Sequence, residues 1–148
     1  MATLHQALAT DAAEIARLST ELGYPVSPHE IAGRLAILLS SPLHFVSVAR
    51  EGSCLLGWIA AEQRLSLESG EKAELTGLVV DPSARRQGIG KLLVSAAERW
   101  AAGRGLRKVT VRSNIARKES HPFYESLGYA RLKTAHAYMK TLPTPCIA

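Results

Sequence analysis

The chain has 148 residues, of which 47% are hydrophobic and 21% are charged, and its formal net charge is +5. This size and composition are typical of one globular domain, and no apolar run approaches the length of a membrane-spanning helix. The basic residues are spread along the chain, so charge alone gives a nucleic-acid-binding domain little support. The cysteines, Cys54 and Cys146, have no metal or redox spacing. We expect a cytoplasmic protein without metal, nucleic acid or membrane.

The first half of the chain is expected to contain two helices and a hairpin. Residues 4–8 are a weak candidate strand, and residues 11–14 have the spacing of a capping box, which would start a helix that Gly23 ends. A capping serine, a proline and a glutamate at 27–30 predict a second helix. Two strand-like runs, 45–49 and 54–61, then predict an antiparallel hairpin.

The second half is expected to complete the sheet. Residues 63–72 are polar and predict a turn, and residues 73–80 predict a buried strand. An alternating strand is expected at 108–112, and a short helix from residue 120 to Gly128. Two further strands are predicted at 129–132 and 136–142, followed by a loose tail at 143–148.

The segment between the buried strand and the amphipathic helix that follows it indicates an anion site. It contains Gly88 and Gly90, which allow a sharp turn and a close approach of the backbone to a ligand. The unpaired N–H groups and the positive dipole end of the following helix would then face that ligand, typically a phosphate. The dinucleotide fingerprint fails because its third glycine is replaced by Leu93, and the P-loop fails because Leu92 follows Lys91.

The spacing of Arg85, Gly88 and Gly90 resembles the pyrophosphate loop of the GCN5-related N-acetyltransferase (GNAT) superfamily. The preceding strand, the strand at 108–112 and the Phe-Tyr-Glu-Ser-Leu-Gly-Tyr segment at 123–129 follow in the order that this family shows. Together these motifs cover residues 43–142. The resemblance implies a single α/β (α+β) domain over residues 1–148, with a mixed, largely antiparallel sheet flanked by helices on both faces.

The resemblance also implies how acetyl-coenzyme A would be held. The pantetheine arm would pair with the backbone of the strand at Leu78, Val79 and Val80. The pyrophosphate would meet the loop and the first helical turn, which comprise Arg85, Arg86, Gln87, Gly88, Ile89, Gly90 and Lys91. The alternative is that the two glycines only make a tight turn. Arg85 and Arg86 could each bind phosphate or be solvated.

In the resembled family, proton transfer falls to a strand glutamate and a tyrosine. Glu74 lies fourteen residues before Gly88, as does the base of the histone-acetylating branch, which acts through water. A glutamate that forms a surface ion pair is the alternative. Tyr124 is the candidate acid for the departing thiolate, or its hydrogen-bond donor. Asn114 is our choice for the side chain that binds coenzyme A, although Arg117 stands where many family members have asparagine.

We interpret the chain as a bacterial-type N-acetyltransferase. It would transfer acetyl from acetyl-coenzyme A to a primary amine of a small molecule, peptide or protein, by direct attack and without a covalent enzyme intermediate. The alternative is a non-catalytic regulatory module that binds coenzyme A or acetyl-coenzyme A. Tyr24 and His29 are candidate substrate contacts, but the sequence does not identify the acceptor. The expected strands at the end of the chain leave a homodimer open.

Overall fold

The computed structural model describes residues 2–85, 87–113 and 119–145. Its contacts divide the chain into two compact units, residues 1–112 and 113–148, which are described separately below. The described part of the first unit contains a five-stranded sheet, three α-helices and two short 3₁₀ helices. The described part of the second contains one short helix.

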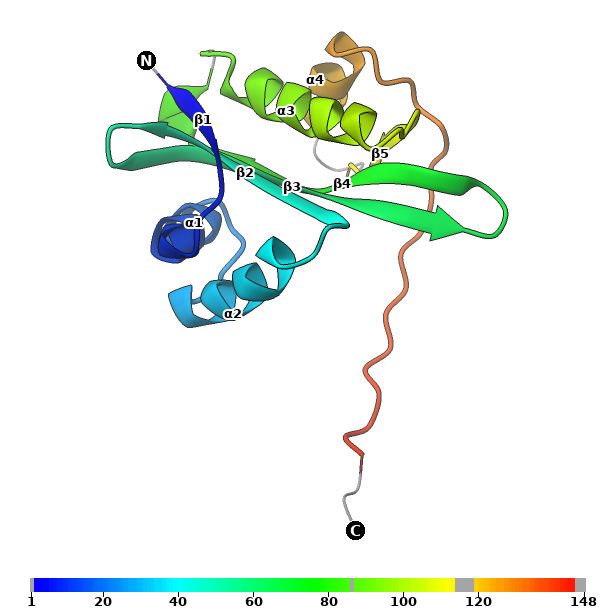
Figure 1. Cartoon of the computed structure of the whole chain (residues 1–148), viewed down its shortest axis with the longest axis horizontal. Helices are drawn as coiled ribbons and strands as arrows, with labels where there is room; N and C mark the ends of the chain where they lie inside the picture. The colour runs from blue at the N-terminus through cyan, green and yellow to red at the C-terminus, as the bar shows by residue number, and fades with distance from the viewer. Residues whose placement is uncertain (1, 86, 114–118, 146–148) are drawn as a thin grey trace. The chain divides into compact units, whose positions relative to one another are not determined.

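The sheet has the strand order β1-β2-β3-β4-β5, and only its last pair of strands is parallel. The strands are β1 (Thr3–Gln6), β2 (His44–Glu51), β3 (Cys54–Ser66), β4 (Gly70–Val80) and β5 (Val109–Val111). β3 and β4 form a long hairpin that extends beyond the other strands (Figure 1). The expected turn at 63–72 is therefore wrong in its length, because strand pairing continues to Ser66 and Gly70.

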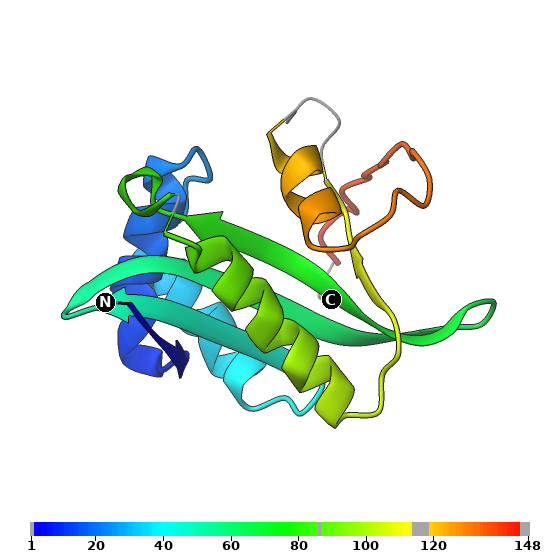
Figure 2. The ribbon, with the colours of Figure 1, turned by 90° about the horizontal axis from the view of Figure 1, so that it is seen from above.

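Helices cover both faces of this sheet. α1 (Ala12–Glu21) and α2 (Pro28–Leu39) lie on one face, and α3 (Ile89–Gly103) lies across the other (Figures 1 and 2). One core cluster packs α1 and α2 against β2, β3 and β4, with Leu18, Val48 and Leu55 almost fully buried. On the opposite face Phe45 of β2 stacks on Trp100 of α3. The predicted α/β class, with a mixed and largely antiparallel sheet, is confirmed.

The two expected capping boxes have different outcomes. Ser27 caps α2 as predicted: its hydroxyl accepts from the N–H of Glu30, whose carboxylate accepts from the N–H of Ser27. The box at the start of α1 is wrong, because the Asp11 side chain makes no capping bond to α1 and caps the preceding 3₁₀ helix (Ala9–Asp11). Its carboxylate instead accepts from the N–H of Leu8 and pairs with Arg50 of β2. This buried ion pair ties the start of α1 to the sheet.

The second unit contains α4 (Ser120–Ser126), which ends before Gly128 at φ 92°. The strands predicted at 129–132 and 136–142 are wrong, since residues 129–145 have no regular secondary structure. Alternating sequence favours a strand only where a partner edge supplies its hydrogen bonds. Tyr138 and Met139, both 92% exposed, show how little of this segment is covered. The tail at 143–145 is likewise irregular, and residues 146–148 lie outside the described part.

Candidate active site

Among the described residues, no strand pairs with the outer edge of β4 beyond Leu75, and this stretch is called the open edge below. β4 pairs with β5 through Ala73, Glu74 and Leu75. The N–H of Asp81 donates to the carbonyl of Leu56 at 2.7 Å, which is on the β3 side. Because backbone groups alternate between the two edges of a strand, Leu78 and Val80 direct theirs to the opposite, open edge. An extended ligand could add there as a strand.

A β-bulge at Thr76 produces this geometry. Leu75 pairs with Ala61 and Gly77 pairs with Ala60, so Thr76 is the extra residue in β4. The bulge reverses the alternation of side chains, so that Leu75 and Leu78 share the face covered by α3. Glu74 lies on the other face, with α1 and α2. Without a bulge, Glu74 would share a face with Leu78 and Val80, as strand parity alone predicts.

The glycine loop connects this edge to α3. Gly88 is the N-cap of α3 with φ 75°, a conformation that favours glycine. No side chain caps this helix, and no hydrogen bond from the N–H of Ile89, Gly90 or Lys91 occurs among the described residues. Arg85, Gln87 and Lys91 are exposed, whereas Ile89 is buried in the core. The start of α3 is thus an array of donors with basic side chains beside it.

Glu74 belongs to a row of polar side chains across three strands. It is 9% exposed, and its Oε2 accepts a 2.9 Å bond from Nη1 of Arg64. Arg64 Nε also lies 3.7 Å from Oε1 of Glu62, which is the register partner of Glu74 on β3. Nε2 of His44 on β2 lies 3.4 Å from the second oxygen of Glu62. Glu74 is therefore an ion-paired and nearly buried carboxylate, and its role as a base stays a prediction.

Several side chains of this region were not found from the sequence. Trp58 lies over Gly77: a Cβ added to that glycine would stand 2.7 Å from the indole ring. The Trp58 Nε1–H donates to Ser19 Oγ of α1 at 3.1 Å, which fixes the ring. Arg64 lies in β3, within the segment 63–72 for which the sequence predicts a turn. If the β3–β4 hairpin is extended to Ser66 and Gly70, Glu62 stands opposite Glu74. The pairing of these two strands is therefore the signal that identifies Glu62 and Arg64 as neighbours of Glu74.

Val79 differs from its two neighbours on β4. Its side chain is 6% exposed and packs in the core beneath α1 and α2. Its backbone groups lie on the β3 side, because they alternate with those of Leu78 and Val80. The open edge is therefore built from Leu78 and Val80, and Val79 supports it from the core.

A cavity of about 350 Å³ lies elsewhere in the first unit, beside the last turns of α2 and α3. It is lined among others by Gln6, Ser41, His44 and Trp100. This cavity is at the edge of β2, at the end of α3 opposite the glycine loop, so the loop does not open into it. Among the described residues, no group of three His, Cys, Asp or Glu side chains could hold a metal ion.

Tyr124 is located in the second unit, within α4. Its ring contacts Tyr129 edge-on with the centroids 5.9 Å apart, and it contacts Phe123 at 5.1 Å. The N–H of Tyr129 donates to the carbonyl of Tyr124, which closes the turn after α4. The predicted aromatic motif thus forms one local cluster. The positions expected for Arg86, Asn114 and Arg117 lie outside the described residues.

Comparison with known proteins agrees with this architecture. A model of the Acetyltransferase (GNAT) family matches residues 9–129. The chain is similar to an aminoglycoside N(6')-acetyltransferase type 1 of Klebsiella aerogenes, with 35% identity over 66% of this chain and 65% of the relative. It is also similar to an aminoalkylphosphonate N-acetyltransferase of Salmonella typhimurium, with 33% identity over 66% of this chain. The chain covers 63% of that second relative, so each alignment spans somewhat less than two thirds of the known protein.

A solved structure shares the fold across nearly the whole chain. It is that of AAC(6')-Iy in complex with the bisubstrate analogue CoA-S-monomethyl-acetylneamine, with a TM-score of 0.85 and 20% identity. The match covers 96% of this chain and 99% of the other. Such a likeness shows that the two chains share a fold. The chain belongs to the Acetyltransferase (GNAT) family. The expected enzyme class, an acyltransferase with acetyl-coenzyme A as the acetyl donor, is confirmed at the level of the family.

Proposed function

We propose that this chain transfers acetyl from acetyl-coenzyme A to a primary amine of a small polyamine-like acceptor of the aminoglycoside kind. The observation that carries this proposal is the open edge of β4, which leads from the bulge at Thr76 to the donor array at the start of α3. A donor lying there would place its pantetheine on Leu78 and Val80 and its pyrophosphate on the first turn of α3.

Two carboxylates lie side by side on the acceptor side of this edge. Glu62 and Glu74 face each other across β3 and β4, and one guanidinium, that of Arg64, lies between them. Arg64 is 45% exposed, so its long side chain can move aside for an incoming ammonium. Two adjacent carboxylates favour an acceptor with more than one positive charge. The aminoglycoside relatives support this choice, while the aminoalkylphosphonate relative marks a different acceptor class.

We assign Glu74 the removal of the acceptor's proton and Tyr124 the protonation or hydrogen bonding of the departing thiolate. A lysine-like amine has a pKa of about 10.4 and is almost entirely charged at neutral pH, so it needs a base before it can attack. The free amine then attacks the thioester carbonyl directly. The C–N bond forms, the C–S bond breaks, and the thiolate takes a proton.

The remaining assignments are part of the same proposal. Asn114 is assigned a contact with coenzyme A, and Arg85, Arg86 and Gln87 are assigned to the pyrophosphate. We also infer a cytoplasmic location in a bacterium and no membrane or nucleic-acid partner. No helix among the described residues is both long and apolar enough to cross a bilayer. A homodimer is supported only by the exposed apolar side chains of the last segment, among them Leu132 and Leu142.

The test is thiol release from acetyl-coenzyme A across an amine panel that contains neamine, spermidine, an aminoalkylphosphonate and a lysine peptide. We expect turnover with neamine above that with the lysine peptide. Velocity patterns that intersect when donor and acceptor are varied are expected for direct transfer. Binding of coenzyme A without turnover of any amine would favour the regulatory module. Turnover confined to the aminoalkylphosphonate would overturn the aminoglycoside-like acceptor.

A further inference from the structure

Thr110 of β5 carries a buried hydroxyl with no hydrogen-bond partner among the described residues. Other buried hydroxyls of the first unit are bonded: Ser19 donates to Ile15 at 2.7 Å, and Ser47 donates to His5 at 2.9 Å. Leaving a buried polar group unpaired costs about 1–3 kcal/mol. Native folds keep such a group only for a reason. Ser113 Oγ shares this property but belongs to the second unit.

The position of this hydroxyl suggests the reason. Thr110 is the register partner of Glu74 across the parallel pair of β4 and β5. Their neighbours Ala73 and Val109 pack toward α3, so Thr110 and Glu74 share the opposite face. Laterally paired residues have Cβ atoms about 5 Å apart, and no direct hydrogen bond joins these two side chains. At that separation a single water could donate a hydrogen bond to the carboxylate and form another with the hydroxyl.

We propose that Thr110 is a positioning residue that holds the water through which Glu74 takes the proton of the acceptor ammonium. This inference rests on the proposed role of Glu74. The water would accept the proton from the ammonium as its N–H bond breaks, and pass one of its own to the carboxylate. Its remaining hydrogen-bonding position is occupied by the Thr110 hydroxyl, which can donate or accept. The net change is one proton moved from nitrogen to Glu74.

The Thr110→Val variant distinguishes a role in positioning the water from a purely structural role of Thr110. Valine has nearly the shape of threonine, suits a strand, and leaves no unpaired hydroxyl. Thr110→Val should therefore leave the melting temperature unchanged or raise it, while kcat falls. With neamine as acceptor we expect kcat to fall roughly ten- to a hundredfold. Removing a general acid or base itself typically lowers the rate by about 10²–10⁴-fold, so this loss reaches only the lower end of that range. The KM for acetyl-coenzyme A should not change.

Thr110→Ser is the matched control, because it keeps the hydroxyl and loses the methyl group. We expect it to retain most of kcat even though the protein becomes less stable. The defect of Thr110→Val should also shrink as pH approaches the pKa of the amine, because free amine then needs no relay. The charged or titratable groups on the face of Glu74 are unchanged in both variants; they include His44, Glu62, Arg64 and Lys72.

Three outcomes separate the claims. Thr110→Val with unchanged kcat, beside a Glu74→Gln variant that is slow, overturns the role of Thr110 and leaves that of Glu74. A lowered melting temperature and lowered kcat in both Thr110→Val and Thr110→Ser makes the residue structural and also overturns it. A fully active Glu74→Gln variant removes the proposed base itself, and the inference about Thr110 with it.

Discussion

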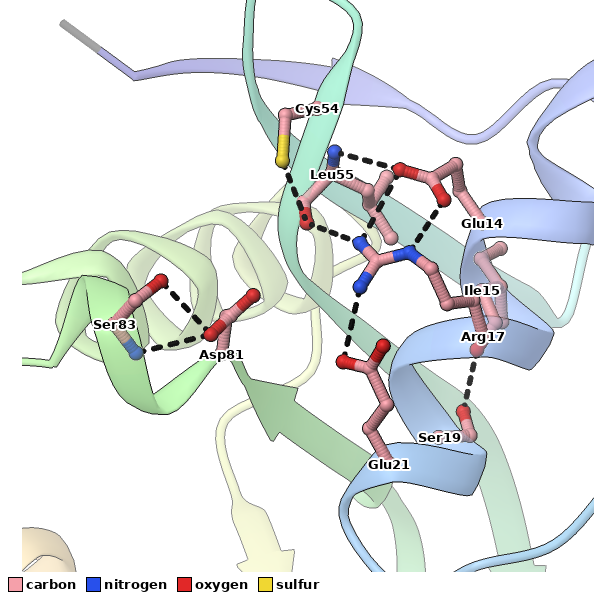
Figure 3. A network of polar contacts seen from close by, with 9 residues as sticks. All are labelled: Glu14, Ile15, Arg17, Ser19, Glu21, Cys54, Leu55, Asp81 and Ser83. Atoms are coloured by element: carbon pink, nitrogen blue, oxygen red, sulfur yellow. Dashed lines mark hydrogen bonds and ion pairs between the residues drawn. The ribbon is translucent and has the colours of Figure 1, made fainter.

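Two glutamates on the same side of the sheet, Glu14 and Glu74, each pair with an arginine but differ in what surrounds the pair. Glu14 of α1 accepts from Nε of Arg17 at 2.6 Å and from the N–H of Leu55 at 3.3 Å (Figure 3). Arg17 also donates to the Leu55 carbonyl and to Glu21 (Figure 3). Every charged group in this cluster thus has a partner within the chain.

In the cluster at Glu74, not every polar group has a hydrogen-bond partner among the described residues. Its arginine is 45% exposed, and the hydroxyl laterally paired with Glu74 has no partner among the described residues. A closed polar network stabilises a fold, whereas an unsatisfied buried group beside a carboxylate indicates a place prepared for a ligand. We therefore expect the Glu14–Arg17 pair to stabilise the fold and the Glu74–Arg64 pair to belong to a ligand site. Exchanging each glutamate for glutamine tests this difference directly.

Glu74→Gln is expected to have the largest effect on activity. Glutamine keeps an acceptor for Arg64 but cannot take a proton, so kcat should fall by roughly 10²–10⁴-fold. The melting temperature should change little, because glutamine still accepts the hydrogen bond from Arg64, whose guanidinium is 45% exposed and screened by solvent. Rates should recover as pH approaches the pKa of the acceptor amine. A defect that does not vary with pH, together with lost stability, would make Glu74 structural.

Tyr124→Phe should follow with a smaller loss of rate, since a thiolate is a fair leaving group without help. We expect a drop of roughly tenfold or more in kcat that persists across pH, and an affinity for coenzyme A close to that of the wild type. Tyr129→Phe removes the hydroxyl of the neighbouring ring in the same cluster and is the control. Equal losses in the two variants would show that the aromatic packing, and not the Tyr124 hydroxyl, matters.

Glu14→Gln should reverse the pattern of Glu74→Gln. We expect a loss of about 1 kcal/mol in the free energy of unfolding, since Glu14 is partly exposed, with kcat unchanged. Chemical denaturation at neutral pH measures the first quantity and thiol release the second. Lost activity with unchanged stability would contradict the structural role of this cluster.

The pH dependence of that stability difference has a definite sign. The hydrogen bond from Arg17 lowers the pKa of Glu14 from its ordinary value of 4.5. A group whose pKa is lower in the folded state contributes stability above its unfolded pKa and loses it as pH falls through the folded one. The stability gap between wild type and Glu14→Gln should be constant near neutral pH and should close below about 4.5. A gap that widens in acid would contradict this pKa direction.

Much of the fold could be predicted because local signals and the family resemblance agreed. The capping box at Ser27 and the left-handed Gly88 at the start of α3 both stand where the sequence indicated. The bulge at Thr76 could not be predicted, because it depends on the register of β4 against β3. Without it, the sequence could not show which face Glu74 occupies. The prediction of the last two strands was wrong, because an alternating sequence specifies which side chains share a face but does not supply the neighbouring strand that a β-strand needs.

The central claim is that the first turn of α3 holds the pyrophosphate of acetyl-coenzyme A, and the melting temperature with coenzyme A tests it most directly. Ligand at 100 times its dissociation constant should stabilise the protein by about 2.7 kcal/mol. Gly90→Glu places a negative charge in the donor array and should abolish this shift while the apo protein stays folded. Gly33→Glu, at an exposed position of α2 with no atom within 4 Å of an added Cβ, should retain it. If coenzyme A raises the melting temperature of Gly90→Glu as much as that of the wild type, the loop does not bind the pyrophosphate, and the central claim is contradicted.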